Sequence, residues 1–330
     1  MSIAALSAND ELRHPHDDQF FWRESLYFNF ADPRNGLGAW FYLWVVPNKP
    51  LKSGMLVSIY KGESGLLTAN ERAYGSPGHR YVGDNGAWVY CYKREVEALI
   101  SADFSDVELC GLRLVRTEPL KSYRISFHDG LDAQIDLDVG FMTPPVDYSA
   151  GVHPTPQWVA KNRYHRSWIA RGEVAIVGER YEIATTGDSD HSWGTRDTEE
   201  YARHEFKMWS FQSPDGKNSV SGIDRDSRMF HGFINIAGEL ESIESISHSS
   251  KYKPTGVQRD IDVTFTDRAG RVVHARMPQM FSAIGNGSST ALWGFEGVGV
   301  FDVDGWGPCS GLTSYFWPAR VSPAQLHGGG

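Results

Sequence analysis

Paired runs of alternating apolar residues, joined by turns that contain glycine, recur along this chain and most constrain its fold. Residues 123–141 show the pattern clearly, because apolar residues at every second position flank the turn Asp129–Gly130. A period of two is that of a strand with one buried face, and Asp-Gly is a favoured hairpin turn. Further hairpins with glycine in the turn are expected in residues 173–183, 230–247 and 262–277.

These hairpins predict an all-β protein. Short strands at regular spacing are typical of sandwiches and barrels, and glycines within strands favour the bulges and corners of closed sheets. Residues 292–303 are interpreted as a glycine-dotted strand pair, and short helices are expected in 94–100 and 154–168. A chain of 330 residues suits two barrel-sized halves. We expect a flexible leader at 1–19, an N-terminal barrel at 20–195 and a C-terminal barrel at 196–330.

Composition and charge make several function classes poor candidates. The net charge is −9 and no block of Lys and Arg occurs, which disfavours nucleic-acid binding. The longest apolar run, residues 39–46, is too short to cross a bilayer as a helix, so no integral membrane contact is expected. The N-terminus turns polar after six residues, which is too early for a signal peptide. We expect a cytoplasmic protein and leave a homodimer open.

The stretch 190–197 gathers side chains that could perform chemistry: Asp190, His191, Trp193, Arg196 and Asp197. In an extended strand, Asp190 and Arg196 face one side, and the other three face the opposite side. One interpretation is the wall of an apolar pocket, where an aspartate or His191 acts as acid or base and Arg196 fixes its charge state. The other is a structural corner, held by an Asp–Arg pair with Trp193 in the core.

A second candidate stretch lies at residues 20–30. Glu24 shares a strand face with Phe28, and Tyr27 lies on the opposite face. A glutamate on an apolar face costs free energy unless it is paired or protonated. Glu24 is therefore either a solvated residue at the start of an edge strand or a buried acid. A buried acid has a raised pKa, which keeps its proton near neutral pH.

Later in the chain, Trp293 and Glu296 lie in an aromatic, glycine-rich strand. Glu296 is either a second acid or an outward-facing residue, while His165 and His231 are interpreted as hydrogen-bonded structural histidines. The sequence contains no HExxH, nucleophile-elbow or GxGxxG motif. We therefore expect no metal, no cofactor and no covalent nucleophile.

Two short motifs carry a resemblance to a known group of proteins. Glu24-Ser25-Leu26-Tyr27-Phe28 is similar to an E-W-W-Y-F signature, and residues 190–194, DHSWG, resemble a D-H-Q-W-G signature that also falls later in the chain. These signatures belong to double-calycin proteins that include carotenoid 1,2-hydratase (hydroxyneurosporene synthase), kievitone hydratase and the AttH-like proteins. In this sequence the two motifs read ESxYFNF (24–30) and DHSWGxRD (190–197), which resemble the motifs of an uncharacterised bacterial branch of that group. Arg196 and Asp197 end the longer, bacterial version of the second motif.

The resemblance implies two lipocalin-like β-barrels packed together, with a hydrophobic ligand in or between them. Glu24, Tyr27, Asp190, His191 and Trp193 fall on the signature residues of that group. The sequence departs from the pattern where Ser25 and Leu26 replace two tryptophans. This departure reshapes the expected pocket, so the resemblance does not carry over a shared substrate.

These observations lead to the expectation of a cofactor-independent lyase. An apolar, aromatic pocket with one neutral acid can protonate an alkene, stabilise the cation on aromatic faces and add water. We expect a hydratase or dehydratase acting on a C=C bond of a bulky isoprenoid, steroid-like or polyketide substrate. The expected catalytic residues are Glu24, Asp190, His191, Arg196 and Asp197, and the expected substrate-binding residues are Tyr27, Phe28, Trp193, Trp293 and Glu296. The alternatives are a non-catalytic carrier of a hydrophobic molecule, and a cyclase, isomerase or pericyclase in the same pocket.

Overall fold

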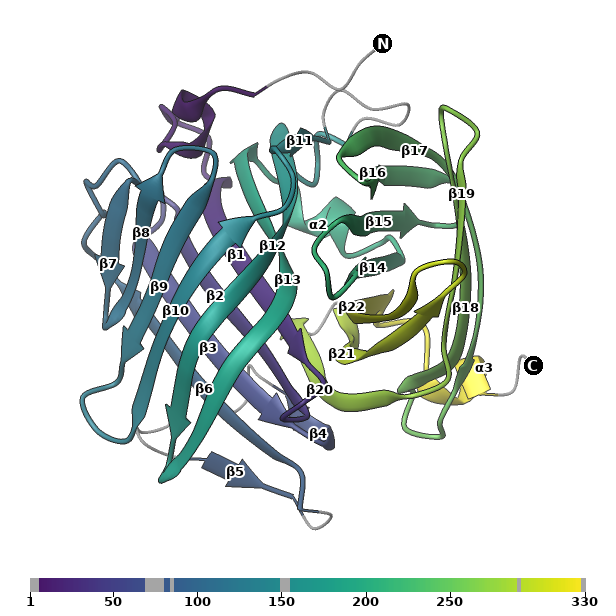
Figure 1. Ribbon diagram of the computed structural model, residues 1–330. Coiled ribbons are helices and arrows are strands. Elements are labelled where there is room, and N and C mark those ends of the chain that lie inside the picture. Colours follow the sequence, from purple (N-terminus) through teal and green to yellow (C-terminus); the bar gives the residue numbers. More distant parts are fainter. Residues whose placement is uncertain (1–5, 69–79, 84–85, 149–154, 290–291, 328–330) are drawn as a thin grey trace.

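The computed structural model describes residues 6–68, 80–83, 86–148, 155–289 and 292–327, which form two large antiparallel sheets (Figure 1). The all-β prediction is confirmed. The helices of the described residues are short: η1 (Ala8–Glu11), α2 (Thr198–Tyr201) and α3 (Pro323–His327). None of them is long and apolar enough to cross a membrane.

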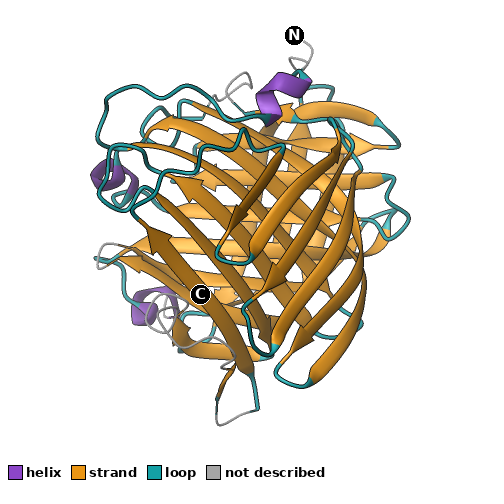
Figure 2. Ribbon diagram, turned by 90° about the vertical axis from the view of Figure 1, so that its left-hand side faces the viewer, coloured by secondary structure: helices purple, strands orange, loops and turns teal. Residues whose placement is uncertain are grey.

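The first sheet has 12 strands and curls into a half-barrel around its own core (Figures 1 and 2). β11 (Val146–Asp147) pairs with β12 beside the main order. That order is β5 (Arg80–Val82), β6 (Trp88–Val96), β3 (Ser53–Lys61), β2 (Leu37–Val45), β1 (Trp22–Asp32), β13 (Glu179–Thr195), β12 (Asn162–Ile176), β10 (Ala133–Phe141), β9 (Ser122–His128), β8 (Leu112–Glu118) and β7 (Asp106–Leu109).

The second sheet has 10 strands, most of which close into a barrel. Its order is β19 (Val272–Met277), β18 (Gln258–Asp267), β17 (Glu239–Tyr252), β16 (Met229–Ile236), β15 (Asn218–Arg225), β14 (Phe206–Gln212), β22 (Gly307–Pro318), β21 (Leu292–Val303), β20 (Met280–Ser289) and β4 (Glu63–Thr68). β19 also pairs with β21, which closes the ring of β14–β19, β21 and β22. The second half is thus a closed barrel, as expected, whereas the first half is curled but open.

The strongest hairpin signals are correct. β9 and β10 pair with Phe127 opposite Ile135, and Asp129 accepts hydrogen bonds from two backbone N–H groups of the intervening turn. The β12–β13 hairpin turns at Val177 and Gly178, both of which have positive φ. In each case the apolar alternate residues face the core, which is why a period of two predicts these strands.

Three local predictions are wrong. The helix expected at 94–100 is the end of β6 followed by a turn, and the described part of 154–168 is a turn leading into β12. Residues 292–303 form the single strand β21 rather than a strand pair. Its glycines provide close approach instead of turns, because a Cβ at Gly294 would lie 1.9 Å from the carbonyl oxygen of Tyr315.

Residues 6–19, within the segment expected to be a leader, contact the first sheet. Glu11 is fully buried at the end of η1 and accepts hydrogen bonds from Arg166 at 2.5 Å and from the backbone N–H of Leu120 at 2.7 Å. Charge-assisted hydrogen bonds of this kind are strong when they are buried. They hold η1 against the strands that follow it.

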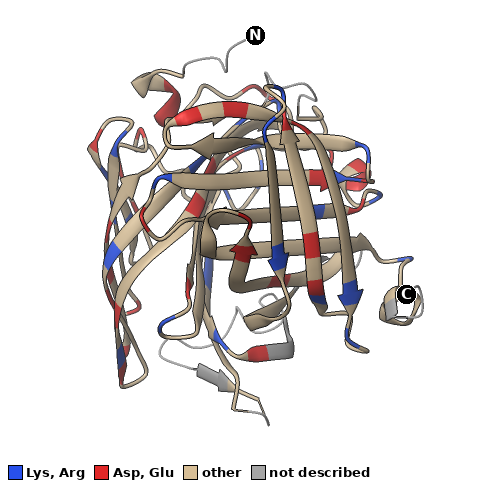
Figure 3. Cartoon of the chain, turned by 45° about the vertical axis from the view of Figure 1, so that its right-hand side comes forward, with Lys and Arg blue, Asp and Glu red and all other residues tan. Residues whose placement is uncertain are grey.

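The two sheets pack against each other through apolar outer faces. Trp40, Trp44 and Leu56 of the first sheet meet Ile284, Val298 and Leu312 of the second in one buried cluster. The far face of the barrel is polar, and Figure 3 shows Lys and Arg interspersed there with Asp and Glu. Strands of the first half form the first sheet and strands of the second half form the second sheet, with one exception. β4, from the first half, pairs in parallel with β20 of the second sheet.

Candidate functional site

A cavity of about 520 Å³ lies between the two sheets, outside both of their cores. We call it the inter-sheet cavity. Its apolar wall includes Trp40, Tyr42, Trp44, Leu56, Phe206 and Phe316. The first sheet contributes this wall from β2 and β3, and the second from β14 and β22. A cavity of this size with aromatic walls is typical of small-molecule sites, and this one also has charged and hydroxyl side chains in its wall.

Strand alternation selects which residues of β1 and β13 reach the cavity. Tyr27 is paired with Asp190, and Ser25 with Ser192, so that all four side chains share one face of the sheet. Their neighbours point into the half-barrel instead. The prediction that residues 190–197 divide between two faces is correct.

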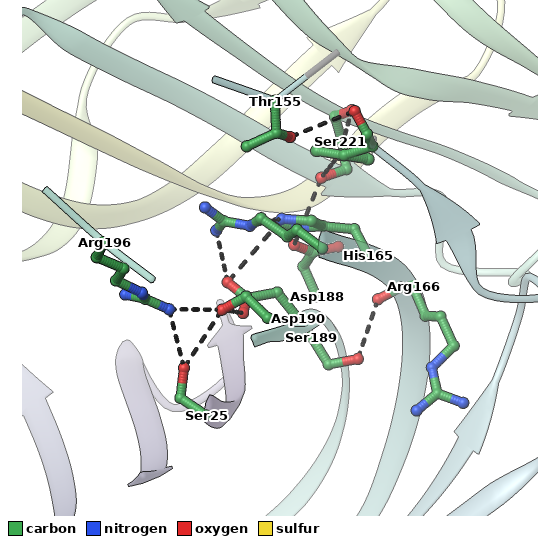
Figure 4. Close-up of polar contacts among 12 residues, drawn as sticks. Ser25, Thr155, His165, Arg166, Asp188, Ser189, Asp190, Arg196 and Ser221 are labelled. Carbon is green, nitrogen blue, oxygen red and sulfur yellow. Dashed lines mark hydrogen bonds and ion pairs between the residues drawn. The ribbon is translucent and has the colours of Figure 1, made fainter. Parts of the chain in front are cut away.

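Asp190 ends a chain of buried polar contacts that begins behind the cavity wall (Figure 4). The Nη2 of Arg163 donates to Asp190 at 2.5 Å, and the Nε of Arg163 donates to Nε2 of His165 at 2.8 Å. The other ring nitrogen of His165 lies 2.9 Å from Asp188. Each contact fixes the next side chain, so Asp188 and His165 orient Arg163, and Arg163 orients Asp190.

Burial shifts the pKa values of Asp188, His165 and Arg163, and so determines their charges. Desolvation, with the negative charge of Asp190, raises the pKa of Asp188 well above its ordinary value. Desolvation and the adjacent Arg163 lower the pKa of His165 well below its ordinary value. Burial acts downward on Arg163, but Asp190 and neighbouring tyrosines outweigh it and raise its pKa. His165 is therefore a neutral acceptor for a permanently charged Arg163.

The second sheet also contributes a carboxyl group to the cavity. The hydroxyl of Tyr27 donates to Glu296 of β21 at 3.4 Å, and Glu296 is 7% exposed. Burial, reinforced by the negative charge of Glu296, raises the pKa of Tyr27 well above its ordinary value. Tyr27 thus stays a neutral phenol. The cavity brings together four predicted site residues: Tyr27, Asp190, Arg196 and Glu296.

Arg196 does not form the expected pair with Asp190. Its Nη2 donates to Ser192 at 2.7 Å and to Ser25 at 3.3 Å, and Arg163 takes the place beside Asp190. Ser192 connects the two, because its hydroxyl also donates to Asp190 at 3.4 Å.

Glu24 and His191 form a separate cluster on the inner face of the first sheet. Nε2 of His191 lies 2.9 Å from Glu24, and Nδ1 of His14 lies 2.7 Å from the same oxygen. The backbone N–H of His14 also donates to Glu24, and the His14 ring stacks on Trp193 with centroids 3.7 Å apart. We call these residues the Glu24–His191 cluster. Glu24 is fully buried and does not line the inter-sheet cavity.

The expectation of a raised pKa for Glu24 is wrong. Burial acts upward, but hydrogen bonds from His14 and His191 outweigh it and lower the pKa. For His191, burial outweighs Glu24 and lowers the pKa. The ligand atoms of His14, Glu24 and His191 lie within 4.8 Å of one another, a spacing that could hold a metal ion. In the structure these atoms satisfy one another by hydrogen bonds.

The remaining predicted site residues lie outside the cavity wall. Phe28 is in the core of the half-barrel, and Trp293 packs against the core of the second barrel. Asp197 caps α2, accepting hydrogen bonds from the backbone N–H groups of Glu199 and Glu200. Their assigned roles stay predictions, as do those of Glu24, His191 and Trp193.

Sequence reasoning missed Arg163 and Asp188, and with them the support of Asp190. His165 is hydrogen bonded at both ring nitrogens, as expected of a structural histidine. The available signal was strand register: in the β12–β13 hairpin, His165 is opposite Asp190 and Arg163 is opposite Ser192. The helix expected at 154–168 hid this register.

Comparison with protein families identifies a family for this chain. A family model described as a domain of unknown function (DUF7064) matches residues 7–79 and 81–298. No curated protein matches the chain.

Three solved structures are similar to the chain at low sequence identity. An AttH-like protein from Nitrosomonas europaea has a TM-score of 0.57 and 13% identity, covering 91% of this chain and 93% of its own. Kievitone hydratase from Nectria haematococca has a TM-score of 0.52 and 10% identity, covering 89% and 88%. CghA, solved with Sch210972, has a TM-score of 0.56 and 11% identity, covering 98% and 94%. The resemblance to the AttH-like and kievitone hydratase group is confirmed as one of fold.

Proposed function

The chain belongs to the DUF7064 family, and we propose that its inter-sheet cavity is the active site of a cofactor-independent lyase. The reaction is hydration or dehydration at a C=C bond of a bulky hydrophobic substrate. Isoprenoid, steroid-like and polyketide molecules are the substrate classes. The similarity in fold to kievitone hydratase, a hydratase by name, supports this class of reaction.

One observation carries the proposal: besides Glu95, which lies beside Lys93, a single aromatic cavity holds Asp190 from the first sheet and Glu296 from the second. Hydration of an alkene needs an acid that protonates one carbon and a base that activates water for the other. Asp190 and Glu296 divide these two roles. The faces of Trp40, Tyr42 and Trp44 stabilise the cation that forms between the two steps.

The remaining polar residues position this pair. Arg163 fixes the carboxylate of Asp190, and the chain through His165 to Asp188 fixes Arg163. The neutral phenol of Tyr27 orients Glu296. Because the reacting groups lie between two packed sheets, only 11% of the Asp190 side chain and 7% of Glu296 are exposed to solvent.

The test is product formation from a panel of isoprenoid, steroid-like and polyketide alkenes and alcohols, followed by mass spectrometry. We expect the gain or loss of one water. Asp190→Asn and Glu296→Gln should each lower kcat/KM by about 10²–10⁴-fold while the far-ultraviolet circular dichroism stays unchanged. Asp138→Asn, an exposed residue of β10, is the matched control and should turn over normally.

Two outcomes would contradict the lyase. Ligand that is bound but recovered unaltered would indicate a carrier. A product of unchanged mass but altered retention would indicate a cyclase or isomerase in the same cavity.

A further inference from the structure

Two guanidinium groups in the wall of the inter-sheet cavity, those of Arg23 and Arg196, have no carboxylate partner among the residues that the structure describes. Two other cavity cations, Arg163 and Lys93, differ in this respect. Arg163 is paired with Asp190 at 2.5 Å, and Lys93 lies 3.3 Å from Glu95. Both side chains are partly buried, and a cation removed from water is normally paired, so two unpaired guanidiniums in one cavity need a separate explanation.

The surroundings of Arg23 and Arg196 leave donors free. The Arg23 guanidinium lies 5.0 Å from the ring centroids of both Tyr42 and Trp44. Among the residues that the structure describes, the guanidinium of Arg196 donates to the hydroxyls of Ser25 and Ser192 alone. The Nε atoms of both arginines are buried and have no hydrogen-bond partner. Burying a donor without an acceptor costs free energy, which a ligand with acceptor atoms would recover.

The charges around this part of the cavity are predominantly positive. The cavity wall contains the cations Arg23, Lys49, Lys93, Arg163 and Arg196, against the acids Glu95, Asp190 and Glu296. Burial, with the charge of Arg196, lowers the pKa of Arg23. Burial acts upward on the pKa of Tyr42, but the charges of Arg23 and Arg196 outweigh it and lower that pKa. The direction for Tyr42 indicates a positive potential beside its hydroxyl.

We propose that Arg23 and Arg196 bind a carboxylate group on the substrate, whose apolar body lies against the aromatic wall of the cavity. The planar guanidinium fork matches the two oxygens of a carboxylate, and stacking on Tyr42 and Trp44 holds one fork in place. This inference rests on the proposed function in taking the inter-sheet cavity as the ligand site. It narrows the substrate from a hydrophobic molecule to a hydrophobic acid.

The position of the carboxylate site also orients the substrate. Ser192 accepts a hydrogen bond from Arg196 and donates one to Asp190, so the carboxylate site adjoins a reacting group. The carbon that reacts therefore lies toward the carboxylate end of the substrate. Loss of Arg196 consequently weakens binding and also disturbs the placement of the reacting bond.

Binding of matched pairs tests the proposal. Retinoic, abietic and oleic acids and their methyl esters are titrated into the full-length protein, and quenching of tryptophan fluorescence reports occupancy beside Trp40 and Trp44. At least one acid should bind about tenfold more tightly than its ester, a difference of about 1.4 kcal/mol. Arg23→Gln and Arg196→Gln should each reduce this preference, and the double variant should abolish it. Affinity for the ester should stay within about twofold, which shows that the cavity is intact.

Arg196→Lys should keep part of the preference, because it retains the charge but loses the planar fork. Arg124→Gln, on the exposed outer part of β9, is the matched control and should keep the full preference. Equal affinity for every acid and its ester, no binding of any acid, or a preference that survives in the double variant would each overturn the proposal.

This experiment separates the two proposals because it requires no turnover. A protein that prefers acids but alters none of them contradicts the lyase and leaves the carboxylate site standing. Turnover of uncharged substrates with the same kcat/KM as the corresponding acids overturns the carboxylate site and leaves the lyase standing.

Discussion

Adjacent residues of β13 serve two separate environments. Asp190 faces the inter-sheet cavity and is fixed by Arg163, whereas His191 faces the half-barrel and binds Glu24. Both residues belong to one short motif, yet only Asp190 can touch a ligand in the cavity. Substitutions of residues on the cavity face should therefore affect ligand binding or turnover, whereas the same chemical change on the half-barrel face should affect stability.

At the residue scale, Glu24→Gln should lower stability rather than remove a reacting group. The ionised carboxylate of Glu24 accepts from the ring and backbone of His14 and from His191, and a neutral amide forms weaker hydrogen bonds with the same donors. We expect a loss of about 2 kcal/mol in the free energy of unfolding, measured with urea. Glu182→Gln, with 82% of its side chain exposed, is the control and should be neutral. Equal stabilities of the two variants would exclude this role of Glu24.

The buried histidines predict a pH dependence of stability. Burial and Arg163 lower the pKa of His165 well below 6.5. As pH falls below 6.5, the unfolded state takes up a proton that the folded state does not, so the free energy of unfolding decreases. His165→Asn should remove this contribution and flatten the decline in stability between about pH 7 and about pH 5. An unchanged slope would contradict a neutral His165.

His204 offers a control of opposite sign. Burial acts downward on its pKa, but the hydrogen bonds that its ring donates to Asp226 and Glu200 outweigh burial and raise the pKa above 6.5. Its contribution to stability is present below pH 6.5 and is lost as pH rises through the folded pKa. His204→Asn should therefore make the decline of stability toward acid steeper, which is the reverse of the effect of His165→Asn.

At the scale of elements, β13 lies between β1 and β12, and these strands leave no space for a side chain at Gly187. A Cβ there would lie 1.9 Å from the carbonyl oxygen of Asn29 and 2.6 Å from the indole of Trp168. Gly187→Ala should force β1 and β13 apart and lower the thermal midpoint, with a cost of about 1–3 kcal/mol. Gly140→Ala in β10, where nothing lies within 4 Å of the added Cβ, is the matched control. Comparable midpoints for both variants would refute this packing.

The sequence was sufficient to predict the strands and the face on which each residue lies, but not which strands pair or in what register. Alternation assigns Tyr27 and Asp190 to one face of their strands and Glu24 and His191 to the other. It does not specify that Arg163, rather than Arg196, contacts Asp190, because that depends on the register of β12 against β13. The proline-rich approach to β12 also resembled a helix. Closure of the second sheet through β19 and β21 is likewise a long-range pairing without a local signal.

At the scale of the whole molecule, one hydroxyl connects both sheets. Ser282 of β20 accepts from the backbone N–H of Gly62 and donates to the carbonyl of Gly36, each at 2.7 Å. Ser282→Ala leaves both groups without this partner, and we expect a loss of about 1–3 kcal/mol. Near- and far-ultraviolet circular dichroism should still report a single shared midpoint. Ser247→Ala, exposed on β17, is the control, and separate transitions for the two sheets would contradict the coupling.

The pairing of β4 with β20 also determines the order in which this protein can be completed during synthesis. Gly62 and Ser282 are 220 residues apart, so the first half emerges from the ribosome long before the strand that covers β4 exists. Until then the backbone groups of β4 form a free edge, which is the kind of surface that captures strands of other chains. Slow translation of the second half should therefore expose this protein to misassembly more than slow translation of the first.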